Sequence, residues 1–329
     1  MIAARAGAGR IEVRPYRLRL KRPLVTARGV HEVREGFVVF AHDGERTGRG
    51  DAAPLPELGT ESLAACLRAL EDARFDALPS TPAARCAVEQ ALLDLEAQRA
   101  GVPLARFLEP SAPLAVPASA VLVAGASPEL AREAQAAFSE GFRTLKLKVG
   151  ADDDHARAAV VRDAAGPELE LRLDANGAWD APAALRKLRE LAPLDIELCE
   201  QPTPDLVGLA ASPIAIAADE MIAFDPEGAL DRARILVLKP MLLGGLIPAL
   251  HLARRAHGRG LQVIVTTALE SGVGRAGAAH LAAAVLALGP QPAAGIATGR
   301  LFADAAEDDP FAPRLGVVHI PDREGLGLP

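Results

Sequence analysis

Residues 144–176 read TLKLKVGADDDHARAAVVRDAAGPELELRLDAN, and they contain the pattern that decides the fold. The runs TLKLKVG (144–150) and ELRLDAN (170–176) are typical of strands. The segment between them, with its many alanines and charged residues, is typical of a helix. A strand, a helix and a second strand in this order predict a parallel strand pair joined by a crossover helix.

The same alternation continues on both sides of this unit. Further strands are predicted at 116–123, 195–202, 214–220, 234–240, 262–270 and 293–302, and helices between them, for example at 127–142, 181–193 and 244–260. Eight strands alternating with helices predict an α/β fold with a (β/α)8-type barrel, placed at residues 113–311. An open doubly wound sheet is the alternative, but such sheets usually have fewer strands and a glycine-rich phosphate loop, which this sequence lacks.

The residues before the barrel follow a different pattern. Strands are predicted at 13–26 and 35–44, with a turn at Asp43–Gly44, and helices at 62–73 and 82–101. This order predicts a separate α+β capping domain over residues 1–112. The tail, residues 312–329, is rich in glycine and proline and is expected to return to this domain.

The composition is that of an ordinary globular protein. The 329 residues carry 36 basic and 43 acidic side chains, a net charge of −7, and no basic run, which argues against nucleic-acid and membrane partners. No stretch reaches ~18 apolar residues, and the first twenty lack the apolar run of a secretory signal, so we expect a cytoplasmic protein. Cys66, Cys86 and Cys199 have no C-x-x-C spacing and are expected to be buried thiols. The oligomeric state is left open.

Lysine is rare in this chain, and three lysines fall in predicted barrel strands. There are five lysines against 31 arginines. Lys146 and Lys148 lie two residues apart, so their side chains point to the same face of a strand, and Lys239 lies at the end of another strand. Arginine stays protonated in proteins, whereas lysine can release and take up a proton. These three lysines are therefore candidates for proton transfer.

Three carboxylates end three consecutive predicted strands. Asp174, Glu200 and Asp219 would meet at the carboxyl ends of the strands, where barrel enzymes have their active sites. One carboxylate after a strand is more often a helix cap or a turn residue. Three in register supply hard oxygen ligands that suit Mg²⁺, with Mn²⁺ as the second choice. The lysines on the strands before and after this trio would flank a bound substrate.

Gly244 and Gly245 follow Lys239 and have two interpretations. They either relieve crowding at the start of a helix or present backbone N–H groups to an anion. Histidine is not expected to take part in catalysis, because none of the seven histidines ends a predicted barrel strand.

Five motifs occur in order at the ends of consecutive predicted strands: TLKLKVG, LRLDANGAWD, CEQP, AADE and LVLKPMLLGG. Together they resemble the enolase superfamily, in its muconate-lactonizing-enzyme subgroup, over essentially the whole chain. The resemblance implies catalytic lysines at Lys146, Lys148 and Lys239, and metal ligands at Asp174, Glu200 and Asp219.

The same resemblance implies supporting residues. Asn176 and Glu220 fall on positions beside the metal ligands. Ser271, with Gly244 and Gly245, would contact the anionic part of a small-molecule carboxylate substrate. The variable loop TARGVHEVREG (26–36) corresponds to the segment that helps to set specificity, and its Arg28 would meet either a substrate carboxylate or water, of which we favour water.

Within the subgroup the chain is most similar to the o-succinylbenzoate synthases. The run QVIVTTALESG (262–272) has no histidine, unlike mandelate-racemase relatives, and GIATGRLF (295–302) lacks the D-x-D pattern of dipeptide epimerases. This similarity implies a lyase, a hydro-lyase that performs the Mg²⁺-dependent syn dehydration of 2-succinyl-6-hydroxy-2,4-cyclohexadiene-1-carboxylate in menaquinone biosynthesis, with Lys148 as base and then acid. N-succinylamino-acid racemases share almost all of these motifs and are the alternative. A non-catalytic metabolite-binding barrel is the alternative of a different class.

Overall fold

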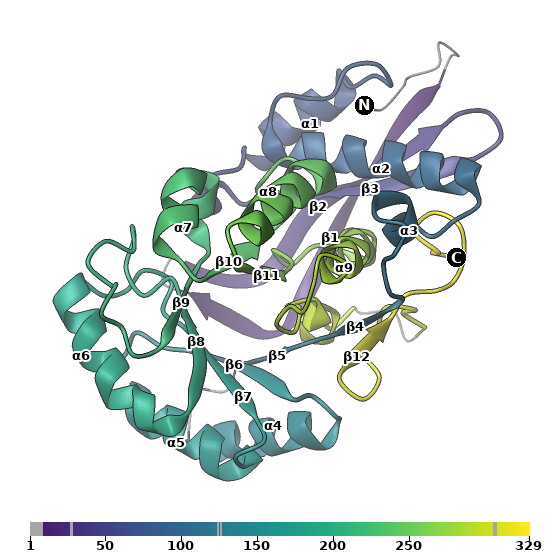
Figure 1. The fold of residues 1–329 in the computed structure, drawn as a ribbon. Helices are drawn as coiled ribbons and strands as arrows, with labels where there is room; N and C mark the ends of the chain where they lie inside the picture. The colour runs from purple at the N-terminus through teal and green to yellow at the C-terminus, as the bar shows by residue number, and fades with distance from the viewer. Residues whose placement is uncertain (1–8, 27–28, 124, 126, 305–307) are drawn as a thin grey trace.

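The computed structural model describes residues 9–26, 29–123, 125, 127–304 and 308–329. A curled parallel sheet with helices on its outer side forms the larger part of the molecule, and an antiparallel sheet with its own helices lies against it (Figure 1). The predicted fold class, a parallel α/β barrel with an N-terminal capping domain, is confirmed.

Seven parallel strands neighbour one another in the order in which they follow along the chain. They are β5 (Ala120–Leu122), β6 (Thr144–Lys148), β7 (Glu170–Asp174), β8 (Ile196–Glu200), β9 (Ala215–Ala218), β10 (Ile235–Leu238) and β11 (Gln262–Val265). The outer helices are α4 (Ser127–Ser139), α5 (Asp154–Ala165), α6 (Ala181–Leu191), α7 (Pro226–Arg232), α8 (Leu246–Gly258) and α9 (Gly272–Leu286). Apolar side chains are buried on both faces of these strands, which explains why the strands are short apolar runs in the sequence.

Two residues close the barrel in place of a full eighth strand. Ala294 forms a parallel bridge with Ala118, and Gly295 forms one with Thr266. The predicted strand 293–302 is therefore wrong in length, since the 3₁₀ helix η4 (Ala297–Leu301) begins two residues after Gly295. Only glycine fits at this bridge, because a Cβ on Gly295 would lie 2.2 Å from Thr266 Oγ1.

The capping sheet consists of three antiparallel strands covered by helices. The strands are β1 (Arg10–Thr26), β2 (Gly29–His42) and β3 (Thr47–Ala52). The helical elements are η1 (Pro56–Leu58), α1 (Leu63–Glu71), α2 (Pro82–Ala100) and α3 (Leu104–Leu108). The predicted turn at Asp43–Gly44 joins β2 to β3, and α2 ends at Gly101, which has a φ of +67°.

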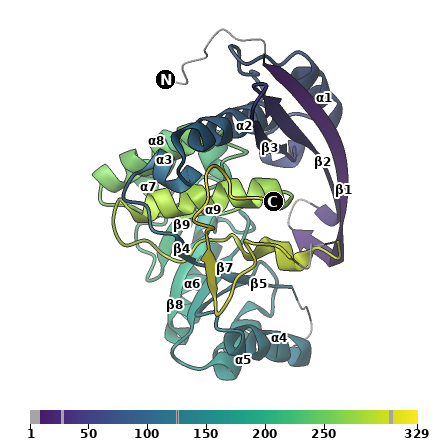
Figure 2. The same cartoon turned by 90° about the vertical axis from the view of Figure 1, so that its right-hand side faces the viewer.

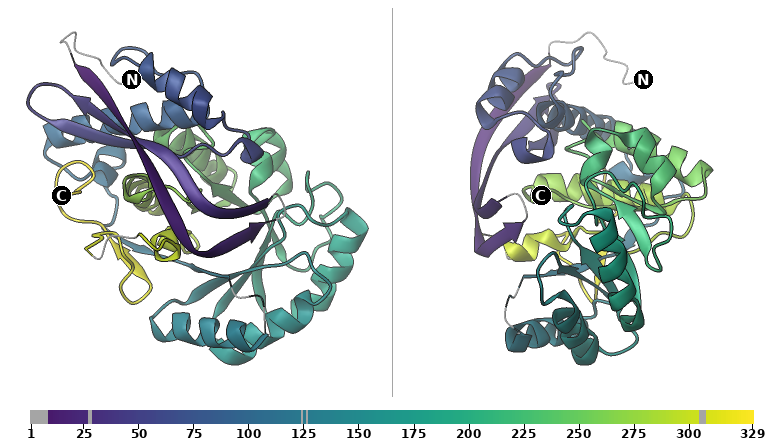
Figure 3. Two further views of the ribbon diagram at one scale, coloured as in Figure 1. Left: turned by 180° about the vertical axis from the view of Figure 1, so that it is seen from behind. Right: turned by 90° about the vertical axis from the view of Figure 1, so that its left-hand side faces the viewer.

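The capping hairpin and the C-terminal segment both contact the barrel. The long hairpin of β1 and β2 extends from the capping sheet across one side of the barrel (Figure 3), and its Leu20 bridges Phe302 just after η4. The C-terminal segment runs beside the barrel (Figure 2), where β12 (Val317–His319) pairs with β4 (Ala115–Pro117). Farther along, Leu326 N donates to Asp94 Oδ1 of α2 at 2.7 Å.

Two further findings concern membrane-spanning helices and the thiols. Within the described part of the chain, no helix is both long and apolar enough to cross a membrane. Cys66, Cys86 and Cys199 are free and buried, as expected.

Candidate active site

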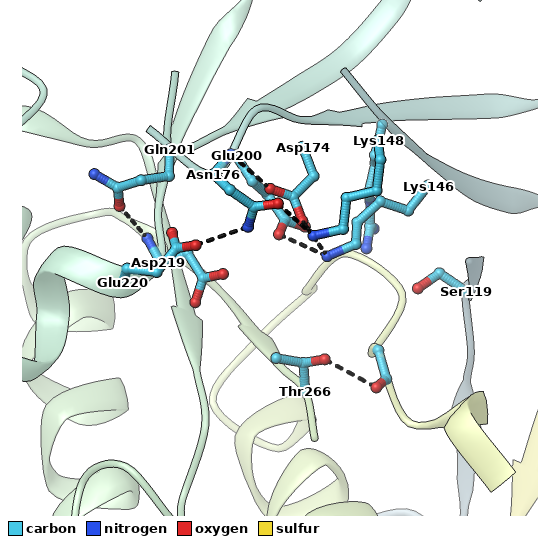
Figure 4. Close-up of polar contacts among 12 residues, drawn as sticks. Ser119, Lys146, Lys148, Asp174, Asn176, Glu200, Gln201, Asp219, Glu220 and Thr266 are labelled. Atoms are coloured by element: carbon cyan, nitrogen blue, oxygen red, sulfur yellow. Dashed lines mark hydrogen bonds and ion pairs between the residues drawn. The ribbon is translucent and has the colours of Figure 1, made fainter. Parts of the chain in front are cut away.

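Most of the charged residues that end the barrel strands line one cavity at the mouth of the barrel (Figure 4), and Glu200, which is not among its lining residues, accepts from Lys146. The cavity has a volume of about 120 Å³. From the barrel side it is lined by Lys146, Lys148, Asp174, Asn176, Asp219, Glu220 and Lys239. From the capping side it is lined by His31, Leu55, Glu57 and Leu58. The structure thus brings together side chains that lie up to about two hundred residues apart in the sequence.

Lys146 and Lys148 both contact Asp174. Lys146 Nζ lies 2.9 Å from Asp174 Oδ2 and donates to Glu200 Oε2 at 2.9 Å. Lys148 Nζ donates to Asp174 Oδ2 and to Asn176 Oδ1, both at 2.6 Å. Lys146 and Lys148 lie two residues apart on β6 and point to the inner face of the barrel, as strand alternation predicted. Asp174 at the end of β7 and Asn176 just beyond this strand meet them there.

Across the cavity, Lys239 forms an ion pair with Asp219. Asn176 connects the two halves of the site, since its Oδ1 accepts from Lys148 and its Nδ2 donates to Glu220 Oε1 at 2.7 Å. Lysines therefore stand on both sides of the carboxylates, so a substrate bound between them would have a potential acid–base group on each side.

Burial and charge act in opposite directions on these groups. Burial disfavours the ionised form of Asp174, but the charges of Lys146 and Lys148 outweigh it and lower the pKa of Asp174. Burial raises the pKa of Glu200, and Lys146 offsets this only in part. Burial also disfavours the charged form of Lys239, yet Asp219 and Glu220 outweigh it and raise its pKa. In this arrangement the lysines are counterions of the carboxylates.

The donor set fits a divalent cation. Asp174, Glu200 and Asp219 offer carboxylate oxygens from three neighbouring strands and are at most 5% exposed, and such oxygens are the ligands that Mg²⁺ prefers. Glu220 Oε2 beside them is buried and has no hydrogen-bond partner. Because each carboxylate is turned to a lysine or an amide, no group of three metal-binding side chains within the described residues is gathered around one point.

Gln201 is a site residue to which the sequence analysis gave no role. Its Oε1 accepts from the backbone N of Asp219 at 2.9 Å, and its Nε2 donates to Thr203 O at 2.8 Å. Its backbone has a φ of +39°, a conformation that few non-glycine residues adopt. Gln201 thereby fixes the backbone that presents Asp219. The motif CEQP contains it, but the motif alone does not show which backbone group the amide contacts.

The three expected substrate contacts lie elsewhere. Neither Gly244, Gly245 nor Ser271 is among the described residues that line the cavity. A carboxylate oxygen of Glu89 lies where a Cβ on Gly245 would be, and the backbone N of Ser271 donates to Asp51 Oδ2 at 2.7 Å. Carboxylates of the capping domain thus lie beside Gly245 and Ser271, whereas Gly244 faces Arg85. Arg28 lies outside the described residues.

Other residues that line the cavity carried no signal in the sequence. Thr298 and Leu301 of η4 and Leu269 after β11 form part of its wall. A second cavity, of about 730 Å³, shares Val121 and Leu301 with the first and extends between β1 and α4. The second cavity therefore lies next to the first, with Val121 and Leu301 between them.

Family models match both parts of the chain. Residues 129–329 match the model described as "Enolase C-terminal domain-like". Residues 11–97 match the model described as "O-succinylbenzoate synthase, N-terminal domain".

Curated relatives include enzymes of two kinds. The o-succinylbenzoate synthase of Thermobifida fusca is 39% identical over 218 residues, which cover 62% of this chain and 66% of the relative. The L-Ala-D/L-Glu epimerase of Bacillus subtilis is 33% identical over 312 residues, which cover 83% of this chain and 84% of the relative.

Solved structures of relatives superimpose over nearly the full length. A substrate-liganded complex of the L-Ala-D/L-Glu epimerase from Bacillus subtilis has a TM-score of 0.86 at 28% identity and covers 97% of both chains. The dipeptide epimerase of Enterococcus faecalis, complexed with Mg and the dipeptide L-Leu-L-Tyr, has a TM-score of 0.84 at 28% identity. That alignment covers 96% of this chain and 98% of the epimerase chain.

Proposed function

Because this chain belongs to the enolase superfamily and is an enzyme of its muconate-lactonizing-enzyme subgroup, we propose that it is an o-succinylbenzoate synthase. It would dehydrate 2-succinyl-6-hydroxy-2,4-cyclohexadiene-1-carboxylate to o-succinylbenzoate, the step that serves menaquinone biosynthesis. The observation that carries this choice is the match of residues 11–97 to the N-terminal domain of the synthases. Those residues supply the capping side of the cavity, where His31, Leu55 and Leu58 lie.

Dipeptide epimerases are similar to this chain in sequence and compete with this proposal. The segment GIATGRLF (295–302), which forms the bridge to β11 and then η4, has no acidic side chain to receive the amino group of a dipeptide. It presents Thr298 and Leu301 to the cavity instead. A hydroxyl and an apolar group in this part of the cavity wall, with no carboxylate from the same segment, favour a substrate without a free amino group.

In the proposed reaction, the carbon alpha to the ring carboxylate loses its proton and the adjacent carbon loses its hydroxyl, both from one face. Lys148, in its neutral form, takes the proton and then gives it to the departing hydroxide as water forms. The lysine is therefore neutral again at the end of the reaction. The electron pair of the C–H bond becomes the new ring double bond. Lys239 stays protonated on the other side of the ring, and Asn176 holds Lys148 in place through its Oδ1.

The three carboxylates Asp174, Glu200 and Asp219 would hold the divalent cation. A bound Mg²⁺ supplies positive charge to the substrate carboxylate oxygens as negative charge builds on them. The relative crystallised with Mg supports this choice of ion. Gln201 keeps the backbone of Asp219 in position for this task, and the capping residues His31, Leu55, Glu57 and Leu58 cover one side of the cavity.

N-succinylamino-acid racemase is the second candidate, because Lys148 and Lys239 approach the cavity from separated strands, as two-sided proton transfer requires.

The deciding experiment compares kcat/KM of the purified enzyme with Mg²⁺ on the two substrate types. We expect aromatic product to form from the cyclohexadiene carboxylate faster than any N-succinylamino acid is racemised. The reverse order assigns the chain to the racemases. Absence of α-proton exchange in D₂O with every succinyl substrate would favour the non-catalytic barrel.

A further inference from the structure

Two buried carboxylates of the capping domain bind the first turns of two successive barrel helices. Glu89 of α2 accepts a hydrogen bond from the backbone N of Ile247, in the first turn of α8, at 3.1 Å. Asp51 of β3 accepts one from the backbone N of Ser271, which caps α9, at 2.7 Å. Both side chains are at most 2% exposed. The partial positive charge of a helix N-terminus favours a carboxylate in this position.

Glycines shape the backbone around these contacts. A Cβ on Gly245 would lie 2.0 Å from Glu89 Oε2, and a Cβ on Gly274 would lie 2.8 Å from Asp51 Oδ2. Gly245 also has a φ of +146°, which L side chains rarely adopt. The close approach of the capping carboxylates therefore depends on the absence of side chains at these two positions.

The contact at Glu89 lies one short loop away from Lys239. This loop (240–245) directly follows Lys239, whose carbonyl accepts from Leu242 N at 3.0 Å. Its two ends are joined by a hydrogen bond from Gly245 N to Pro240 O at 2.9 Å. Arg85, one turn before Glu89 on α2, donates from Nε to Gly244 O at 3.2 Å. Helix α2 thus binds a carbonyl of this loop, at Gly244, and an amide of the helix turn that directly follows it, at Ile247.

We propose that Glu89 is a positioning residue that fixes Lys239 in the cavity through the loop 240–245, so that docking of the capping domain sets the geometry of the catalytic lysine. The second contact, between Asp51 and the start of α9, holds the neighbouring loop, whose Leu269 lines the cavity. The part of this inference that concerns turnover rests on the proposed function. The part that concerns the loop does not.

A purely structural role for Glu89 makes a different prediction. In that case, its loss lowers the free energy of unfolding but leaves kcat and the local backbone dynamics of the active enzyme unchanged. Asp94 provides the matched control, because it lies on the same helix, is 2% exposed, and accepts hydrogen bonds from the backbone N of Arg49 and of Leu326. Its partners belong to β3 and the tail rather than to a loop that carries a catalytic lysine.

The test compares Glu89→Gln, Gly245→Ala and Asp94→Asn in the full-length enzyme. Gln keeps the size of Glu89 but has no carboxyl group, and Ala at 245 displaces the Glu89 side chain without changing its chemistry. Backbone hydrogen–deuterium exchange over residues 241–247 should be faster in the first two variants and unchanged in Asp94→Asn. Their kcat should fall about tenfold or more with KM nearly unchanged, since small misplacements of catalytic groups are costly.

A double-mutant cycle identifies the route of the effect. In a Lys239→Ala background, Glu89→Gln should reduce kcat no further, because coupled residues are not additive. Unchanged exchange over 241–247, or losses that multiply in the double variant, would overturn the proposal. If the wild-type enzyme turns over no succinyl substrate, the proposed function fails, and the exchange data alone decide whether Glu89 positions this loop.

Discussion

Lys148 and Asp174 are register partners on the neighbouring parallel strands β6 and β7, and Lys148 Nζ lies 2.6 Å from Asp174 Oδ2. The same ammonium donates to Asn176, two residues beyond Asp174 on the same side of the barrel. The position of the proposed base is therefore set by strand register and not by a loop. A change in the shape or chemistry of this one side chain should affect catalysis with little effect on the fold.

We expect Lys148→Arg to lower kcat by about 10²- to 10⁴-fold, the usual contribution of a general acid–base group. The guanidinium keeps the positive charge beside Asp174 but does not give up its proton. Steady-state kinetics with the cyclohexadiene substrate measures this loss. Lys187→Arg is the control, because Lys187 lies on α6 and contacts Asp154 outside the cavity. A near-normal rate in Lys148→Arg would remove this lysine from the mechanism.

Exhaustive chelation should abolish turnover while leaving the protein folded. The fold is retained because lysines already balance the buried carboxylates, as the contacts of Lys146, Lys148 and Lys239 show. Added Mg²⁺ should restore activity and raise the unfolding temperature, since an ion that binds only the folded state stabilises it, by about 2.7 kcal/mol at 100 times Kd.

Asp219→Asn should reduce both the activity that Mg²⁺ restores and the rise in unfolding temperature that it causes, because the substitution replaces a charged ligand with a neutral one. Titration calorimetry and thermal unfolding with and without Mg²⁺ measure the change without any substrate. Full activity after chelation would contradict the proposed cofactor.

Lys239→Ala separates the two candidate reactions. Racemisation needs a proton-transfer group on each face of the substrate, whereas the syn dehydration uses Lys148 alone for proton transfer. We expect the variant to lose racemisation of N-succinylamino acids and still exchange the α-proton of one enantiomer. Proton NMR in D₂O with each enantiomer follows both processes. Racemisation at the wild-type rate would mean that Lys239 is not the second proton-transfer group.

His280 should make the protein sensitive to acid. The ring is fully buried, accepts from Ala105 N at Nδ1 (2.9 Å) and contacts Leu326 O through Nε2 (3.2 Å). Burial lowers the pKa of His280 to about 4, below the value of about 6.5 in an unfolded chain. The unfolded state therefore binds the proton more readily. The stability that the neutral ring contributes is complete above pH 6.5 and is lost as the pH falls toward 4.

The lowered pKa of His280 corresponds to a loss of ~3 kcal/mol in the free energy of unfolding between pH 6.5 and pH 4, at about 1.4 kcal/mol for each pKa unit. Urea unfolding at several pH values should show a steeper loss below pH 6.5 in the wild type than in His280→Gln. His251→Gln, at an exposed position of α8, should follow the wild type. Parallel pH profiles for the wild type and His280→Gln would show that His280 does not titrate in this way.

The sequence alone determined the barrel and the residues that meet at its mouth. Strand alternation and the position of a residue at the end of a strand are local properties. They sufficed to predict that Lys146, Lys148, Asp174 and Lys239 lie together at the mouth of the barrel. Closure by Ala294 and Gly295 was less predictable, because a run of apolar residues shows that a segment is buried but not how many of its residues form ladder hydrogen bonds.

Only the tertiary structure decided what surrounds Gly245 and Ser271. Both residues were candidates for contact with a substrate anion, but Glu89 and Asp51 of the capping domain lie there. These carboxylates are 158 and 220 residues from the backbone groups that they accept from. The local sequence around a carboxylate in a helix or strand does not show which helix N-terminus that carboxylate will contact. The free energy of that contact exists only once the two domains have packed and excluded water.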